Sequence, residues 1–157
     1  MSTAEMLEQA SALLSEWANE TKPVEANRVD AVVDREHLAG AVNSLVQSRW
    51  GYLSAITGLD VGTDKDLEVL YHFCRGQAVV TLRVPVPKLD PRIDSISEIV
   101  RYAGLFELEL AEMFGVHVSN IEAGAHLYLP ENWPADTYPL RKDFKTTGVG
   151  EEKRTDG

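Results

Sequence analysis

Residues 67–86, LEVLYHFCRGQAVVTLRVPV, carry the clearest pattern in the chain. Apolar side chains alternate with other positions in two runs, one on each side of Arg75 and Gly76. The apolar members are Leu67, Val69, Tyr71, Phe73, Val80, Leu82, Val84 and Val86. Such alternation is typical of half-buried strands, and a glycine between two runs favours a tight turn. The stretch therefore predicts a β-hairpin, ended by Pro85, Pro87 and Pro91, which force an extended connection.

The N-terminal part of the chain predicts a helix followed by a strand. Ser2 and Glu5 have the spacing of a capping box and open a helix over residues 4–19, which residues 21–23 stop with a proline. The apolar stripe of this helix consists of Leu7, Ala10, Leu14 and Trp17. The valine-rich residues 24–33 predict the strand.

Two helices are predicted on either side of a strand and the hairpin. Asp34 is the candidate cap of the first helix, whose buried face comprises Leu38, Val42, Leu45 and Val46. Residues 52–59 are apolar and partly β-branched, which indicates a strand. Helical periodicity returns over residues 93–114, with Gly104 as a candidate break and Gly115 as the stop. The apolar stripe of this helix is Ile99, Ala103, Phe106, Leu110 and Phe114.

Residues 119–145 have little periodicity, and their prolines are incompatible with a regular element. They nevertheless contain Leu127, Tyr128, Leu129, Trp133, Tyr138, Leu140 and Phe144. A solvated tail would not carry so many large apolar side chains, so this segment packs over its own domain or lies on a partner. Within residues 139–144, two apolar side chains bracket Arg141, Lys142 and Asp143. This pattern suits either a docking segment or an ordinary surface turn.

The order of the elements predicts an α+β fold. We expect a mostly antiparallel sheet with helices packed on one face and a long extended C-terminal docking segment. The expected organisation is an N-terminal helix at 1–21, an α+β domain at 22–118, the docking segment at 119–145 and a flexible tail at 146–157. The tail is expected to fray because it is polar and contains glycine.

The composition excludes several classes of protein. The chain has 25 Asp and Glu and 15 Lys and Arg, which gives a formal net charge of −10. This negative charge disfavours binding to nucleic acid or anionic lipid. Because Cys74 is the only cysteine, we expect no intramolecular disulfide, iron–sulfur cluster or Cys-rich zinc site in this chain. No apolar run is long enough to span a membrane, and the acidic N-terminus does not predict a signal peptide.

Acidic and histidine side chains near the last predicted helix are the main candidates for chemistry. Glu109 and Glu112 share a helix face, and with Glu107 they suit acid–base work or binding of a hard cation. Adding His117 gives the hypothesis of a small acid–base or metal-dependent enzyme that uses Glu109, Glu112 and His117. The opposing interpretation is that these carboxylates form the solvated side of the helix. No Walker A, GxGxxG or GxSxG motif supports nucleotide binding or a serine nucleophile.

Several motifs together resemble one known family. Pro130-Glu-Asn-Trp133, followed by Tyr138-Pro-Leu-Arg-Lys-Asp-Phe144, resembles the C-terminal signature of the thirty-kilodalton subunit of respiratory complex I, the C subunit of the bacterial enzyme. Glu107-Leu-Glu-Leu-Ala-Glu-Met-Phe-Gly115 is similar to the family's Glu-Arg-Glu and Asp-Met-Phe-Gly block. Leu108 and Glu112 depart from that block, so the chain resembles a divergent branch. The same subunit type occurs in membrane-bound nickel–iron hydrogenases and formate hydrogenlyases.

The resemblance implies a non-catalytic structural and assembly subunit of the peripheral arm of a complex I-like NADH (or ferredoxin):quinone oxidoreductase, or the equivalent hydrogenase subunit. It implies no cofactor in this chain, with iron–sulfur clusters, and Ni–Fe in a hydrogenase, held by partner subunits. The implied partners are the large forty-nine-kilodalton or hydrogenase-like subunit, the cluster-bearing small subunit and other peripheral-arm subunits on the cytoplasmic side of the membrane. We expect electron transfer by the complex to be coupled to ion translocation. The expected interface residues are Trp133, Tyr138, Pro139, Leu140, Arg141, Lys142, Asp143 and Phe144, with Glu107, Glu109 and Glu112 as secondary polar contacts.

Overall fold

The predicted hairpin forms the centre of the sheet. A computed structural model describes residues 1–62, 66–121 and 126–145. In it, β4 (Leu67–Arg75) and β5 (Ala78–Val86) pair antiparallel along their whole length. Gly76 makes the turn with a φ of +57°, a conformation that glycine adopts without strain. The apolar side chains of both predicted runs are buried, so the hairpin prediction is confirmed.

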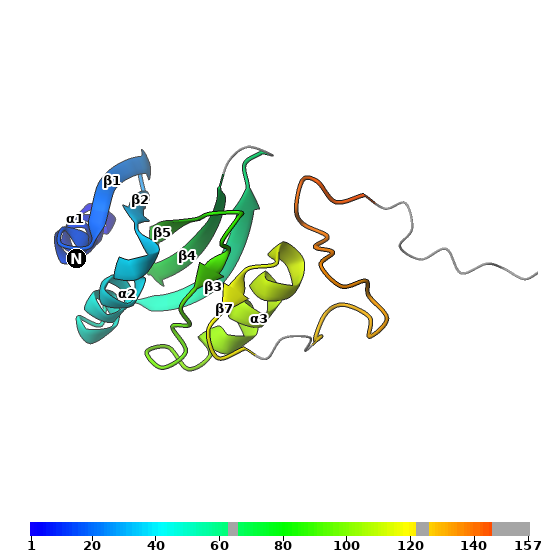
Figure 1. Cartoon of the computed structure of the whole chain (residues 1–157). Coiled ribbons are helices and arrows are strands. Elements are labelled where there is room, and N and C mark those ends of the chain that lie inside the picture. The colour runs from blue at the N-terminus through cyan, green and yellow to red at the C-terminus, as the bar shows by residue number, and fades with distance from the viewer. Residues whose placement is uncertain (63–65, 122–125, 146–157) are drawn as a thin grey trace, which may run out of the picture.

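A five-stranded sheet extends from this hairpin in the order β1-β2-β5-β4-β3 (Figure 1). β3 (Tyr52–Asp60) pairs antiparallel with β4, as does β1 (Ala18–Glu25) with β2 (Arg28–Val33). The remaining pair, β2 with β5, is parallel. The prediction of a mostly antiparallel sheet is therefore confirmed.

The N-terminal region differs from its prediction in two places. α1 (Thr3–Leu14) begins with the expected capping box of Ser2 and Glu5, but it ends well short of residue 19. Residues 24–33 form the end of β1, a turn and β2 rather than one strand. The proline that was expected to stop the helix lies within β1, which tolerates it because β1 is an exposed edge strand.

α2 (Leu38–Gln47) follows a single 3₁₀ turn, η1 (Arg35–His37). The expected cap is wrong, because the Asp34 carboxylate accepts a hydrogen bond from Asn19 Nδ2 at 3.0 Å and not from the helix. The buried face is as predicted for Leu38, Val42 and Leu45, whereas Val46 is partly buried.

The helix predicted over residues 93–114 is present only in its second half. α3 (Ala103–Phe114) ends at Gly115, whose φ of +68° confirms the predicted stop. The first half of the predicted helix is wrong, because residues 92–93 form the short strand β6 (Arg92–Ile93), which pairs in parallel with β7 (His117–Val118). Turns lead from β6 to α3. Of the predicted stripe, Ile99 and Phe106 are only partly buried.

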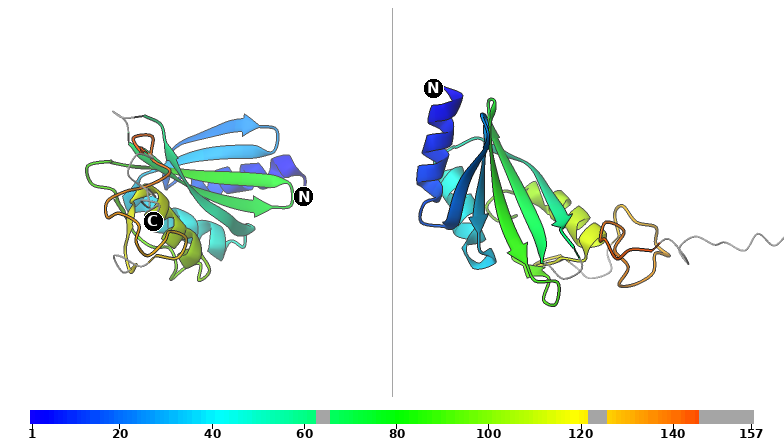
Figure 2. Two further views of the ribbon diagram at one scale, coloured as in Figure 1. Left: turned by 90° about the vertical axis from the view of Figure 1, so that its right-hand side faces the viewer. Right: turned by 90° about the horizontal axis from the view of Figure 1, so that it is seen from above.

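The helices cover one face of the sheet, as predicted. α1 packs on β2 and β5, and α3 packs on β3, so the side chains of the hairpin's alternating runs lie between sheet and helices. Figures 1 and 2 show α3 at the opposite end of the molecule from α1, with residues 126–145 beyond α3. The other face carries polar groups at its centre, where the His72 ring lies 3.0 Å from the hydroxyls of Thr57 and Thr81. Within the described residues, no helix is long and apolar enough to cross a membrane.

Candidate functional site

The C-terminal end of α3 anchors the segment of residues 126–145. Because Gly115 has no Cβ, the Tyr138 ring lies directly against its backbone; a Cβ there would be 2.3 Å from Tyr138 Cε2. Arg141 Nε donates to the Phe114 carbonyl at 2.6 Å, and Leu140 N donates to the Met113 carbonyl at 3.1 Å. The Arg141 guanidinium also lies 4.7 Å from the centre of the Tyr138 ring. These contacts satisfy carbonyls that the last turn of a helix leaves unpaired.

Asp60, at the end of β3, is the second anchor. Its carboxylate accepts from Lys142 N at 2.9 Å and from Gly62 N at 3.1 Å, and it pairs with Lys88 Nζ at 2.8 Å. Burial alone would raise the pKa of this carboxyl group. The hydrogen bonds from Lys88, Lys142 and Gly62 outweigh burial and lower the pKa from 3.8 to about 2.

The C-terminal segment folds into turns rather than the expected extended chain. Trp133 Nε1 donates to the Thr137 carbonyl at 2.8 Å, and the Trp133 ring stacks on Phe144 with centroids 6.1 Å apart. Prolines prevent a strand ladder here but are compatible with turns. Among the expected interface residues, Arg141 and Tyr138 contact their own domain through their side chains. Leu140 contacts it through its backbone N–H and is 55% exposed.

The three carboxylates of α3 have different environments. Glu112 is buried and accepts from Leu127 N at 2.6 Å and from Tyr128 N at 2.9 Å. Glu107 is also buried, and it accepts from the backbone N–H of Ile96 and the hydroxyl of Ser95. Only Glu109 is exposed. The solvated-side interpretation is thus wrong for Glu107 and Glu112, because backbone and hydroxyl donors replace the water that a buried carboxylate loses.

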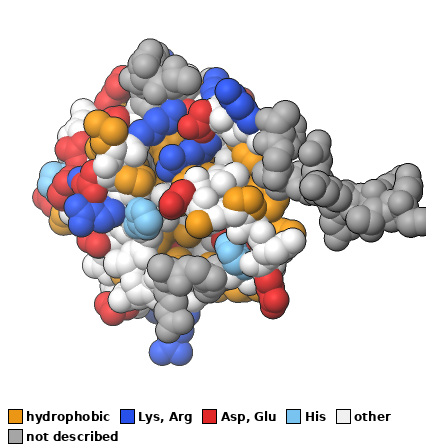
Figure 3. Space-filling view, turned by 45° about the vertical axis from the view of Figure 1, so that its right-hand side comes forward, with side chains coloured by type: hydrophobic (Ala, Val, Ile, Leu, Met, Phe, Trp, Pro, Cys, Tyr) orange, Lys and Arg blue, Asp and Glu red, His pale blue; other side chains and the backbone are white. Residues whose placement is uncertain are grey.

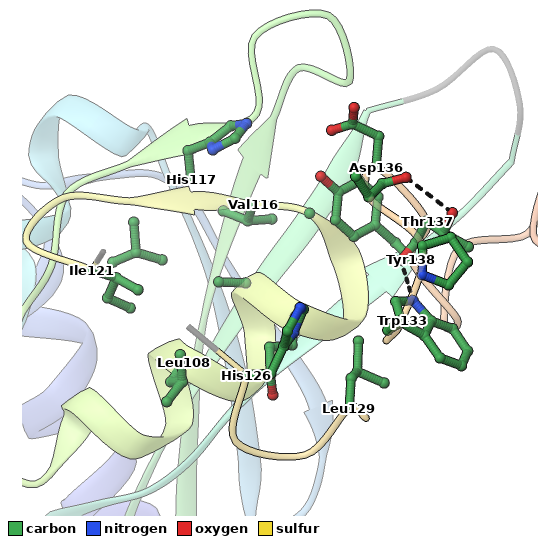
Figure 4. A pocket seen from close by; sticks show the side chains of 16 residues that line it. Leu108, Val116, His117, Ile121, His126, Leu129, Trp133, Asp136, Thr137 and Tyr138 are labelled. Carbon is green, nitrogen blue, oxygen red and sulfur yellow. Dashed lines mark hydrogen bonds and ion pairs between the residues drawn. The ribbon is translucent and has the colours of Figure 1, made fainter. Parts of the chain in front are cut away.

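An apolar hollow of about 360 Å³ lies between α3, β7 and the C-terminal segment. Figure 4 shows Leu108 and Ile121 on one side of it and Trp133 and Tyr138 on the other, with His126 between the two sides. Three large apolar side chains nearby are at least half exposed: Leu127, Tyr128 and Leu140. On this side of the molecule, hydrophobic side chains reach the surface beside charged ones (Figure 3).

The structure does not assemble the enzyme site suggested by Glu109, Glu112 and His117. Glu112 is occupied by its backbone partners and by His126 Nδ1 at 3.3 Å, whereas Glu109 and His117 are exposed. No group of three or more His, Cys, Asp or Glu in the described ranges is placed to hold a metal ion. The predicted tail at 146–157 lies outside the described residues.

Sequence reasoning missed Asp60 and the pairing of Glu112 with residues 126–128. Nothing in the local pattern links these residues, because their main partners are backbone N–H groups. By contrast, Gly115 was identified as a helix stop, and the structure adds its contact with Tyr138.

Comparison with known proteins agrees with the motif resemblance. Residues 31–149 match the family model described as Respiratory-chain NADH dehydrogenase, 30 Kd subunit. The C subunit of the NADH-quinone oxidoreductase of Chloroherpeton thalassium is 35% identical over 104 residues, which are 64% of this chain and 42% of that protein. The C subunit of the F(420)H(2) dehydrogenase of Methanosarcina mazei is 27% identical over 121 residues, 75% of this chain and 76% of that protein. This chain thus spans less than half of the first relative's length.

Two solved structures share the fold. A chain of the membrane-bound sulfane sulfur reductase, described as an archaeal respiratory membrane complex, superposes with a TM-score of 0.76 at 19% identity, covering 91% of this chain and 87% of that one. The trypsin-resistant fragment of Nqo5 has a TM-score of 0.56 at 20% identity, covering 76% of this chain and 97% of the fragment. From the family match over residues 31–149, together with this fold, we conclude that the chain belongs to the 30 Kd subunit family of the respiratory-chain NADH dehydrogenase.

Proposed function

We propose that this chain is a non-catalytic assembly subunit of a membrane-associated respiratory complex of the complex I type. In this proposal it binds a large subunit of the forty-nine-kilodalton or hydrogenase-like type through the outer face of α3, the hollow and residues 126–145. The subunit holds no cofactor of its own, and iron–sulfur clusters belong to neighbouring subunits. It lies at the periphery of the membrane, on the cytoplasmic side, and meets lipid only through its partners.

One observation carries the proposal: the C-terminal segment is fixed to its own domain largely by polar contacts, while three of its large apolar side chains remain exposed. Leu127, Tyr128 and Leu140 are 53%, 51% and 55% exposed. α3 shows the same feature, because Leu105 is 61% exposed although the opposite face of the helix packs on the sheet. A helix with apolar side chains on both faces is typical of burial on both sides. Clustered exposed apolar side chains mark protein–protein contacts.

Full-length point variants test this surface. We expect Leu140→Asp to abolish co-purification of the large subunit from mildly solubilised native membranes, because it places a charge in a desolvated contact. Leu89→Asp is the matched control: Leu89 is exposed as well but lies on the β5–β6 connection. Equal recovery of the large subunit with both variants would contradict the proposed surface. A truncation after Pro130 should likewise leave a folded domain that no longer recovers this partner.

The recovered large subunit also decides the branch of the family. Paired Cys-x-x-Cys nickel ligands in its sequence would identify a hydrogenase-type complex, and their loss would indicate a quinone-linked or related enzyme. Similarity to subunits of both NADH-quinone oxidoreductase and F(420)H(2) dehydrogenase supports the second outcome. Recovery of the chain without any other subunit would overturn the assembly role.

A further inference from the structure

We propose that Glu112 is a positioning residue for docking: from within α3, its carboxylate holds residues 126–129 where they form one wall of the hollow. The inference rests on the proposed function, because the hollow is part of the surface assigned there to the large subunit. Leu129 and His126 line the hollow, and the two residues between them donate their N–H groups to Glu112.

The hydrogen bonds of Glu112 account for the position of this wall. Leu127 N and Tyr128 N donate to Oε1 and Oε2 of Glu112, so both carboxylate oxygens are engaged. Among the hydrogen bonds of the described residues, those to Glu112 are the only ones that join residues 126–129 to the rest of the chain. Leu127 and Tyr128 are about half exposed, so the burial of their side chains contributes little to fixing the loop. A buried, charged acceptor with two backbone donors makes strong, directional hydrogen bonds that can hold the loop in place.

Glu107 offers a matched comparison on the same helix. It is as buried as Glu112, and its carboxylate also binds two donors, Ile96 N and Ser95 Oγ, each at 2.7 Å. Those donors belong to the turn before α3 rather than to the hollow. Replacing either glutamate by glutamine removes the same charge from the same helix, but each change releases a different segment.

Hydrogen exchange of the full chain alone tests the positioning step. Glutamine presents an NH₂ group where one backbone donor needs an acceptor. We therefore expect Glu112→Gln to speed amide exchange at Leu127 and Tyr128 about tenfold or more, with β4 and β5 still protected. Glu107→Gln should leave those two amides protected. Unchanged exchange of Leu127 and Tyr128 in Glu112→Gln would overturn the inference.

A second pair of variants leaves α3 intact and measures docking. Leu127→Pro removes the N–H that donates a hydrogen bond to Glu112, whereas Leu127→Ala removes the same side chain and keeps this N–H. We expect the Kd of Leu127→Pro for the large subunit to be about tenfold higher than that of Leu127→Ala. We expect the Kd of Glu112→Gln to be about tenfold higher than that of the wild type.

The possible outcomes separate the two proposals. Equal Kd values within both comparisons, with wild type binding normally, would overturn the role of Glu112 and leave the docking surface standing. Failure of the wild-type chain to bind the large subunit would instead contradict the proposed function, whatever the exchange data show. If Glu112→Gln does not fold, the Leu127 pair decides alone.

Discussion

The central hairpin and the C-terminal segment are held in place by different kinds of interaction. β4 and β5 bury alternating apolar side chains over their whole length, and backbone ladders satisfy their polar groups. The C-terminal segment instead depends on a few polar anchors, chiefly Asp60, Glu112 and Arg141, each bonded to a backbone group. Apolar burial is shared among many residues and makes unfolding cooperative, whereas isolated anchors permit local opening. The segment should therefore detach without unfolding the domain.

The largest expected effect lies on the core side of this comparison. Trp50 is fully buried, and its Nε1 donates to the Met6 carbonyl at 2.8 Å, which ties α1 to the core. We expect Trp50→Ala to lower the free energy of unfolding by about 3–5 kcal/mol in urea titrations. The neighbouring Tyr52→Ala should change it by less than about 1 kcal/mol, since Tyr52 is 61% exposed. Similar losses for both variants would contradict this picture of the core.

The two regions also differ in how far the sequence predicts them. The hairpin follows from side-chain alternation along one continuous stretch, which reports burial on one face directly. The contact of Asp60 with Lys142 joins residues 82 apart through a backbone N–H, a group that nearly every residue has, so no residue pattern marks it. The buried Glu107 and Glu112 were misjudged for the same reason. Charge alone favours exposure, and only tertiary donors reverse that preference.

Acid should release the C-terminal segment before it unfolds the core. The pKa of Asp60 is about 2 in the folded chain against 3.8 for the free carboxyl, so the stabilisation is present above pH 4. It is lost as the pH falls from about 4 toward 2, at a cost of up to about 2 kcal/mol. The protection of the Lys142 amide, which is the slowing of its exchange relative to an unstructured peptide at the same pH, should therefore fall in that window. In Asp60→Asn the protection of the same amide should show no step between pH 4 and 2; a step that persists would assign the titration to another group.

Gly115 ends α3 and lies against Tyr138 of the C-terminal segment, and its replacement should lower the free energy of unfolding by about 1–2 kcal/mol. Alanine is strained at a φ of +68°, and its Cβ would also displace the Tyr138 ring. Gly76→Ala provides the control, because Gly76 has a similar φ of +57° but nothing within 4 Å of the added Cβ. Urea titrations of both variants separate strain from the Tyr138 contact. We expect Gly115→Ala to lose more stability than Gly76→Ala and to increase exchange at Leu140; equal behaviour would show that Tyr138 contributes nothing to the anchor.

The smallest expected effect concerns Arg141. Its Nε binds the Phe114 carbonyl and its guanidinium lies over Tyr138, and lysine, with a compact ammonium group, cannot reproduce both contacts. Arg141→Lys should lower the free energy of local opening of the segment by about 1 kcal/mol. This corresponds to roughly fivefold faster exchange of the Leu140 amide, which donates to the Met113 carbonyl. Lys142→Ala should leave that amide unchanged, because Lys142 contributes its backbone N–H rather than its exposed side chain. An Arg141→Lys effect that extends to β4 and β5 would mean that segment and core open together, and the anchors would then be part of the cooperative unit.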